Sequence, residues 1–194
     1  MKKLKKLAAI LLAGALSVTC LAGCGSQNNE AKTTDAGKST VDAIKERGTI
    51  KIGVFSDKAP FGYVDSNGEN QGFDVYIAKR FAKDLLGDES KVEFVLVDAA
   101  SRVAYLESNK VDIIMANFTV TDERKQKVDF ANPYMKVSLG VVSPEGAPIK
   151  SEDDLAGKKI IVAKGTTAET YMTEKHPEVE LVKYEQYSEI FQAL

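Results

Sequence analysis

The stretch of sequence that decides the fold is residues 50–97, IKIGVFSDKAPFGYVDSNGENQGFDVYIAKRFAKDLLGDESKVEFVLV. It opens with Ile50–Phe55 and closes with Val92–Val97, two short apolar segments of the kind that forms strands. Between them, apolar side chains recur at the spacing of one helical face, which predicts a helix that begins near Asp74 and ends at Gly87. The residues of this face are Ile77, Ala78, Phe81, Ala82 and Leu85.

The same alternation of strand and helix patterns continues along the chain. Further strand-like segments are residues 111–115, 139–142, 160–162 and 180–182. Strands that alternate with helices predict an α/β fold in which helices pack on both faces of a sheet. Pro60 marks a turn, and Asn67-Gly68 predicts a tight hairpin after Tyr63-Val64.

Sheets of this kind bind ligands in the loops that follow the carboxyl ends of their strands. The sequence places four such loops at residues 55–61, 98–102, 117–124 and 164–167. In the last loop, Gly165 lets the backbone turn, and the hydroxyls of Thr166 and Thr167 and the free amides of the following helix can face an anion. The alternative for these threonines is simple helix capping.

Arg124 stands where ordinary helix chemistry disfavours a cation. Thr121 is typical of an N-cap, and Asp122 and Glu123 are first-turn acids that suit the positive end of the helix dipole. A carboxylate bound between the helix amides and the Arg124 guanidinium would explain the arginine, because arginine grips a carboxylate through two parallel hydrogen bonds. The alternative is a solvated surface arginine.

The start of the chain predicts export. Residues 1–23 combine a basic start with an apolar stretch too short for a comfortable membrane span, and they resemble a signal peptide. Their end resembles the lipobox of bacterial lipoproteins, which implies that Cys24 becomes the lipidated N-terminus. Cys20 would be lost, so no cysteine is left for a disulfide, a metal site or a nucleophile. We expect an extracytoplasmic protein anchored to the bacterial cell membrane, in the periplasm or on the outer face of the cytoplasmic membrane.

Residues 24–40 are polar and lack apolar periodicity, which predicts a flexible tether. The body begins near Val41 and is long enough for one good core or two small lobes. A net charge of −2 gives no basic excess, which argues against a nucleic-acid partner. We expect a small-molecule partner, and the sequence implies no metal or redox cofactor.

Several segments, in shared order and spacing over most of the body, resemble the polar amino-acid-binding proteins of ABC importers, known as solute-binding protein family 3. These segments are Gly53-Val54 with Pro60-Phe61, Gly72–Val75, Asn109–Asp112, Thr119–Arg124, Asp129-Phe130 with Pro133-Tyr134, and Asp154–Lys158. The resemblance implies a periplasmic-binding-protein-like fold of type II, in which two α/β lobes close over one amino acid. It also implies a monomer that delivers its ligand to an ABC permease in the membrane.

On this resemblance, lobe 1 comprises residues 41–140 and lobe 2 residues 141–194, with a strand at Leu139–Ser143 in the first hinge crossing. Lobe 2 would be incomplete, because the chain stops at Leu194 inside an apolar-faced helix without a stop signal. Family members continue with a strand whose aspartate pairs with the ligand ammonium. We therefore expect a fragment of a longer product, with weak or no ligand affinity.

The resemblance also assigns the backbone end of the ligand. Arg124 would clamp the α-carboxylate, together with the amide of Thr121 and an amide around Thr166-Thr167 from the opposing lobe. The carbonyl of Asn117 and the hydroxyl of Thr119 would accept from the α-ammonium. One ligand would thus tie both lobes together and convert binding energy into closure.

The side-chain end of the ligand is less closely defined. Arg102 matches a position where acidic amino-acid binders hold the ligand's side-chain carboxylate, which favours aspartate or glutamate. Phe55 lies where some of those binders carry a second basic residue, for which Lys58 could substitute unless it is simply solvated. Phe55 or Phe61 would supply an apolar wall, with core packing as the alternative. Cysteine-binding members share a similar context around Arg102, so cysteine or another neutral polar amino acid is the alternative ligand.

Two other classes of protein use the same fold. Some relatives are dehydratases or cell-wall lyases, but the loops named above contain no His/Cys/Asp constellation and no paired carboxylates, so we expect no enzymatic activity. A chemosensory domain would need a membrane span and a signalling domain, which a lipid anchor does not supply.

Overall fold

The computed structural model describes residues 39–194, so the predicted signal peptide, Cys24 and most of the predicted tether lie outside the described residues. The first element is helix α2, Thr40–Arg47, whereas the sequence pattern predicts tether up to residue 40. A capping box starts this helix, because the side chains of Ser39 and Asp42 each accept a hydrogen bond from the other residue's amide. Ile44 then packs into the core.

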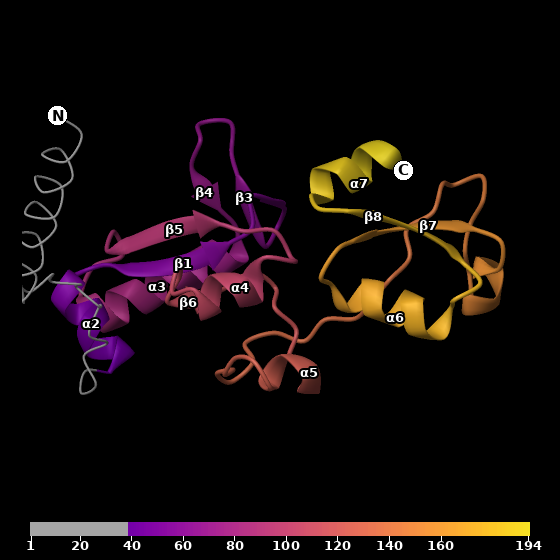
Figure 1. The fold of residues 1–194 in the computed structure, drawn as a ribbon. Coiled ribbons are helices and arrows are strands. Elements are labelled where there is room, and N and C mark those ends of the chain that lie inside the picture. Colours follow the sequence, from indigo (N-terminus) through magenta and orange to yellow (C-terminus); the bar gives the residue numbers. More distant parts are fainter. Residues whose placement is uncertain (1–38) are drawn as a thin grey trace, which may run out of the picture. The chain divides into compact units, whose positions relative to one another are not determined.

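The central sheet is parallel and has the strand order β5-β1-β6 (Figure 1). Strands β1, Ile50–Val54, and β5, Val92–Leu96, confirm the two strands predicted at the ends of the opening stretch. Strand β6 is only Ile113–Ile114, shorter than the predicted segment 111–115. The next amide on each side of β6 still donates to a β1 carbonyl group, so the segment follows β1 beyond the assigned strand.

A small antiparallel sheet, β2-β3-β4, follows β1. The predicted hairpin is confirmed, but its loop is residues 65–69 and not a two-residue turn. The Asp65 carboxylate explains the longer loop, because it accepts hydrogen bonds from the amides of Asn67 and Glu69. The three strands are Asp57–Lys58, Gly62–Val64 and Asn70–Gln71.

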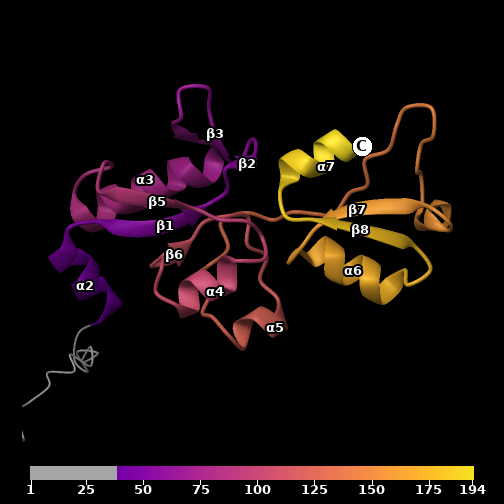
Figure 2. The same cartoon turned by 45° about the horizontal axis from the view of Figure 1, so that its top comes forward.

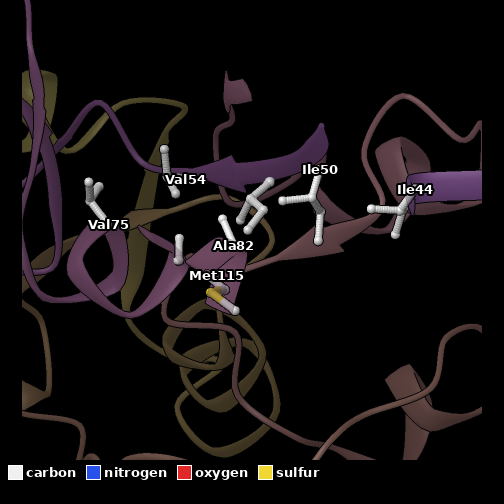
Figure 3. Packing of buried hydrophobic residues seen from close by; sticks show 8 residues of the cluster. Ile44, Ile50, Val54, Val75, Ala82 and Met115 are labelled. Carbon is white, nitrogen blue, oxygen red and sulfur yellow. The ribbon is translucent and has the colours of Figure 1, made fainter. Parts of the chain in front are cut away.

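Helix α3, Phe73–Leu86, covers one face of the central sheet and confirms the predicted helix. Figure 3 shows the buried side chains between this helix and β1. Ala78 and Ala82 of the predicted face are fully buried, whereas Phe81 is 39% exposed. The cluster consists of Ile44, Ile50, Ile52, Val54, Val75, Ala78, Ala82 and Met115.

Helix α4, Arg102–Glu107, covers the other face of this sheet (Figure 2). Because strand side chains alternate between faces, Phe55 points away from the α3 side and joins a second buried cluster. That cluster also contains Val97, Ala99 and Ala116. Helices therefore lie on both faces of the sheet, as the alternating pattern predicts.

A second parallel sheet pairs β7, Lys159–Ala163, with β8, Glu180–Tyr184, and both strands match predicted segments. Helix α6, Thr167–Lys175, lies on one face of this sheet, and helix α7, Tyr187–Ala193, lies on the other (Figures 1 and 2). A short 3-10 helix, Glu152–Leu155, precedes β7. The separate core of this region consists of Leu155, Val162, Met172 and Val179.

The sequence predicts a strand at Leu139–Val142, in the expected hinge crossing at 139–143, and this prediction is wrong. This segment has no regular secondary structure, and its side chains are exposed, with Val142 72% exposed. β-branched residues favour a strand only when their backbone groups find a neighbouring strand to bond. Within residues 39–194 no strand pairs with this segment.

Truncation of the central core tests the packing around β1. Ile52 is fully buried between β1 and α3, so Ile52→Ala should lower the free energy of unfolding by about 2–5 kcal/mol. Tyr76→Ala on the same helix is the control, because a side chain that is 65% exposed should change stability by about 0.5 kcal/mol or less. Urea denaturation measures both, and equal losses would contradict the described core.

Candidate functional site

Arg124 lies in the short helix α5, Asp122–Lys125. The hydroxyl oxygen of Thr121 accepts a hydrogen bond from the Arg124 amide at 3.2 Å, which confirms the predicted N-cap. The guanidinium is half-buried and donates to the carbonyl of Thr119 at 2.7 Å and to that of Gly165 at 2.9 Å. Burial lowers the pKa of Arg124. It is therefore a constrained side chain and not a freely solvated one.

Arg102, at the start of α4, is only 3% exposed. Its Nε donates to the carbonyl of Ala99 at 2.9 Å, and Nη1 donates to the carbonyls of Ala116 and Asn117 at 3.0 and 3.3 Å. Nη2 donates to the carbonyl of Gly165 at 3.0 Å. Burial, and then the charge of the nearby Arg124, lower its pKa to about 10. The contacts found for Arg102 thus join backbone loops, and they occupy most of its N–H groups.

The carbonyl of Gly165 therefore receives both arginines. Gly165 has φ +71°, and a Cβ at this position would lie 2.6 Å from Cα of Ala100, which leaves room only for glycine. Its amide donates to the Glu169 carboxylate at 2.7 Å. The loop 164–167 is thus fastened against the loops that carry Arg102 and Arg124.

Thr166 caps helix α6. Its hydroxyl accepts from the amide of Glu169 at 3.2 Å and donates to the carbonyl of Ala163 at 2.7 Å, so the capping alternative describes this side chain. The first amides of a helix have no partner within the helix, so the backbone around Thr166-Thr167 keeps donors for a ligand.

A pocket of about 350 Å³ brings predicted site residues together. Thr121 and Arg124 line it from α5, and Thr167 lines it from α6. Sequence reasoning did not identify the remaining lining residues, which come from the exposed faces of the same two helices. They are Glu123, Thr170, Tyr171 and Glu174.

Asn117 is held by a buried carboxylate. It has φ +46°, and its amide donates to Asp74 Oδ2 at 3.1 Å. The other oxygen of Asp74 accepts from the hydroxyl of Tyr134 at 2.8 Å. Burial raises the pKa of Asp74. Asp74 was missed because a first-turn aspartate ordinarily needs no explanation beyond the helix dipole.

Lys58 is the residue that the sequence offers as a substitute for the second basic residue, with simple solvation as the alternative. Its Nζ donates to Oδ1 of Asn117 at 2.8 Å and to the hydroxyl of Tyr187 at 2.9 Å, and it lies 4.3 Å from the centroid of the Tyr187 ring. Burial, and then the charge of Arg102, lower the pKa of Lys58 to about 8. The simple solvation considered as its alternative is therefore wrong. Tyr187 could not be placed from the sequence, because it lies far along the chain.

Of the two aromatic residues predicted to form an apolar wall, Phe55 lies in the core and Phe61 is half-buried. Phe55 is 1% exposed and packs edge-on against Tyr187, with ring centroids 5.6 Å apart. Phe118 was not predicted, yet its ring centroid lies 4.4 Å from the guanidinium carbon of Arg102 and 4.7 Å from that of Arg124. This ring supports both arginines through cation–π contacts.

Among residues 39–194 no group of three or more His, Cys, Asp or Glu side chains is placed to hold a metal ion. No helix in this range is long and apolar enough to cross a membrane.

The two arginines should respond differently to truncation. Arg102→Met leaves buried carbonyl groups without donors and should lower the free energy of unfolding by about 2–4 kcal/mol. Arg124→Met removes a half-exposed group and should cost about 1 kcal/mol or less. Chemical denaturation of both variants measures the difference, and a stable Arg102→Met protein would contradict the loop-joining role.

Comparison with known proteins identifies the family of the chain. The family described as bacterial extracellular solute-binding proteins, family 3, matches residues 50–187. The ABC transporter glutamine-binding protein of Bacillus subtilis is 38% identical over 194 residues, which cover 98% of this chain and 71% of that protein. The L-cystine-binding protein of Escherichia coli K12 is 31% identical over 94% of this chain and 66% of that protein.

Two solved structures are similar in both sequence and fold. The solute receptor for L-cysteine of Neisseria gonorrhoeae is 62% identical, with a TM-score of 0.78 over 80% of this chain. The cysteine-binding protein from Campylobacter jejuni is 55% identical, with a TM-score of 0.79 over 81% of this chain. The chain spans 63% of each of these two. Its α/β architecture is that of the type II periplasmic binding proteins, and the chain belongs to family 3 of the bacterial extracellular solute-binding proteins.

Proposed function

We propose that this protein is the substrate-binding component of an amino-acid ABC importer, which captures a polar amino acid outside the cytoplasm and delivers it to a membrane permease. Its relatives bind glutamine, cystine or cysteine by name, and this supports the ligand class. The observation that carries the proposal is the pocket at which Thr121, Arg124 and Thr167 meet.

In this proposal Arg124 grips the α-carboxylate of the ligand. Amides at Thr121 and around Thr166-Thr167 complete the anion site, and a carboxylate at this place competes with the carbonyl of Gly165 for the Arg124 guanidinium. The carbonyl of Asn117 and the hydroxyl of Thr119 accept from the α-ammonium. The lobes, residues 41–140 and 141–194, close together because the ligand bonds to both.

We take L-cysteine as the ligand. The receptors that are 62% and 55% identical are cysteine receptors, which gives the alternative from the sequence more weight than aspartate or glutamate. The hydrogen bonds of Arg102 also favour cysteine over aspartate or glutamate. Its guanidinium already donates to four carbonyl groups, so few N–H groups remain for a side-chain carboxylate of the ligand. Aspartate stays the second candidate, since no salt bridge within residues 39–194 occupies Lys58 or either arginine.

The remaining parts of the proposal concern location and partners. Lipid on Cys24 anchors the protein to the cell membrane, residues 24–40 tether the binding body, and a single copy meets the permease. The ligand is released chemically unchanged, as is usual for the solute-binding relatives and unlike a dehydratase or lyase.

Titration calorimetry of the purified protein with cysteine, serine, aspartate, glutamate and glutamine tests the ligand. Relative affinities decide the assignment, and cysteine should bind most tightly. Arg124→Met should weaken cysteine binding roughly 30-fold or more, because a charge-assisted contact worth about 2–3 kcal/mol is lost. Arg124→Lys is the matched control, because lysine keeps the positive charge but cannot form two parallel hydrogen bonds. Its cysteine affinity should lie between those of the unchanged protein and of Arg124→Met. Binding that is unaffected in Arg124→Met would refute the clamp, and conversion of the ligand, detected by mass spectrometry, would refute the transport role.

The membrane anchor has its own test. Cys24→Ala should move the protein from the membrane fraction to the soluble fraction and abolish labelling by radioactive fatty acid. Cys20→Ala is the matched control, because Cys20 lies in the predicted signal peptide. This substitution should leave both the membrane location and the labelling unchanged. Retention of Cys24→Ala protein in the membrane fraction, with its label intact, would contradict the proposed anchor.

A further inference from the structure

A single buried side chain, that of Asp74, bonds to both ends of the segment 117–134. Asp74 is 0% exposed and lies in the first turn of α3. Its Oδ2 accepts a hydrogen bond from the amide of Asn117 at 3.1 Å, and its Oδ1 accepts one from the hydroxyl of Tyr134 at 2.8 Å. The two oxygens of one carboxylate thus hold together two points that are distant along the chain.

The segment between these two points carries much of the proposed ligand site. Its regular secondary structure consists of the short helix α5. A segment with so few hydrogen bonds of its own needs contacts with other parts of the molecule to keep one conformation. The contacts that close its two ends therefore also fix the position of its ligand-facing groups, which are Thr119, Thr121 and Arg124.

The start of α3 is a rigid base for such a contact. The amides of Phe73 and Asp74 donate to the carbonyls of Pro60 and Phe61, both at 2.9 Å. Gly72 has φ +116°, and a Cβ at this position would collide with the carbonyl oxygen of Phe61. A side chain on a rigid element holds its partners more precisely than one on a loop.

A carboxylate suits this position because both of its partners donate hydrogen bonds. Hydrogen bonds to an ionised acceptor are stronger than those between neutral groups, and they offset the cost of burying the charge. Burial raises the pKa of Asp74, and the hydrogen bonds from Tyr134 and Asn117 and the charge of Lys58 oppose this rise. The ring of Tyr134 also packs against Phe73, with ring centroids 6.0 Å apart. Both the ring and the hydroxyl of Tyr134 therefore hold this end of the segment.

We propose that Asp74 is a positioning residue for the ligand site. By bonding to both ends of the segment 117–134, it holds the site residues of that segment in the arrangement that binds the backbone end of the amino acid. Asp74 itself does not touch the ligand. This inference rests on the proposed function, since the residues that Asp74 positions are those assigned there to the ligand.

Amide hydrogen exchange of the ligand-free protein tests whether Asp74 holds the segment. Asp74→Leu removes both hydrogen bonds, so amides of residues 117–134 should exchange about 10-fold faster or more. Val75→Ala is the matched control, because Val75 is the next residue of α3, is 2% exposed and packs in the core around β1. This variant should lose stability without faster exchange in the segment.

Two milder variants test the same contacts. Tyr134→Phe keeps the ring on Phe73 but removes the hydroxyl, so the segment should exchange faster than in the unchanged protein and more slowly than in Asp74→Leu. Asp74→Asn keeps an acceptor for the Asn117 amide and offers an N–H to the Tyr134 hydroxyl, so it should restore most of the slow exchange. If Asp74→Leu does not fold, Tyr134→Phe decides, and unchanged exchange in that variant would overturn the inference.

Titration calorimetry of the same variants tests the effect on the ligand. Asp74→Leu should weaken cysteine binding about 10-fold or more, because affinity falls in proportion to the fraction of molecules that hold the binding arrangement. The factor should be similar for every neutral amino acid that binds, since the segment would contact the backbone end that they share. Asp74→Asn should recover most of the affinity, and Val75→Ala should keep it.

The outcomes distinguish a failure of this inference from a failure of the proposed function. Exchange in the segment that is unchanged in Asp74→Leu, or equally fast in Val75→Ala, would overturn the inference and leave the amino-acid receptor intact. Faster exchange with unchanged affinity would do the same. If the unchanged protein bound none of the amino acids, the proposed function would fail, and the role of Asp74 in binding would fail with it.

Discussion

Two guanidinium groups share one carbonyl oxygen, that of Gly165, and the arrangement of the site depends on this contact. A carbonyl oxygen has two lone pairs and can accept from both arginines at once. To present it, Gly165 takes a left-handed conformation against Ala100, where no side chain fits. Three of the loops at strand ends, 98–102, 117–124 and 164–167, therefore meet at a single backbone group, and Phe118 stacks on the arginines that join them.

The sequence predicts well the features that local pattern decides. The strands β1, β5, β7 and β8 and helix α3 are runs whose apolar spacing matches their final packing. The Thr121 N-cap is equally local, because its hydroxyl bonds within one turn. Once parallel strands are expected, their loops must gather at one edge, so the region of the site could be named in advance. Helix α2 was missed despite a local signal, the capping box of Ser39 and Asp42.

Features that depend on distant parts of the chain could not be predicted in this way. Leu139–Val142 has the composition of a strand, but within residues 39–194 it has no neighbour to bond. Lys58 looks solvated until Tyr187, far along the chain, covers it. Arg102 looks ready for a ligand carboxylate until its carbonyl partners are known. In each case the outcome depends on a partner that spacing along the sequence does not reveal.

The cores on either side of this junction consist of different residues. Two clusters pack around the central sheet, and the cluster of Leu155, Val162, Met172 and Val179 packs around β7 and β8. The described contacts between the two regions are largely hydrogen bonds, made by the arginines, Lys58 and Asp57, with one aromatic contact between Phe55 and Tyr187. Polar groups that separate can bond to water instead, so the hydrogen bonds across the junction oppose its opening less than the packing of Tyr187 on Phe55 does. Because the two regions have separate cores, we expect heating to melt them as distinct cooperative units.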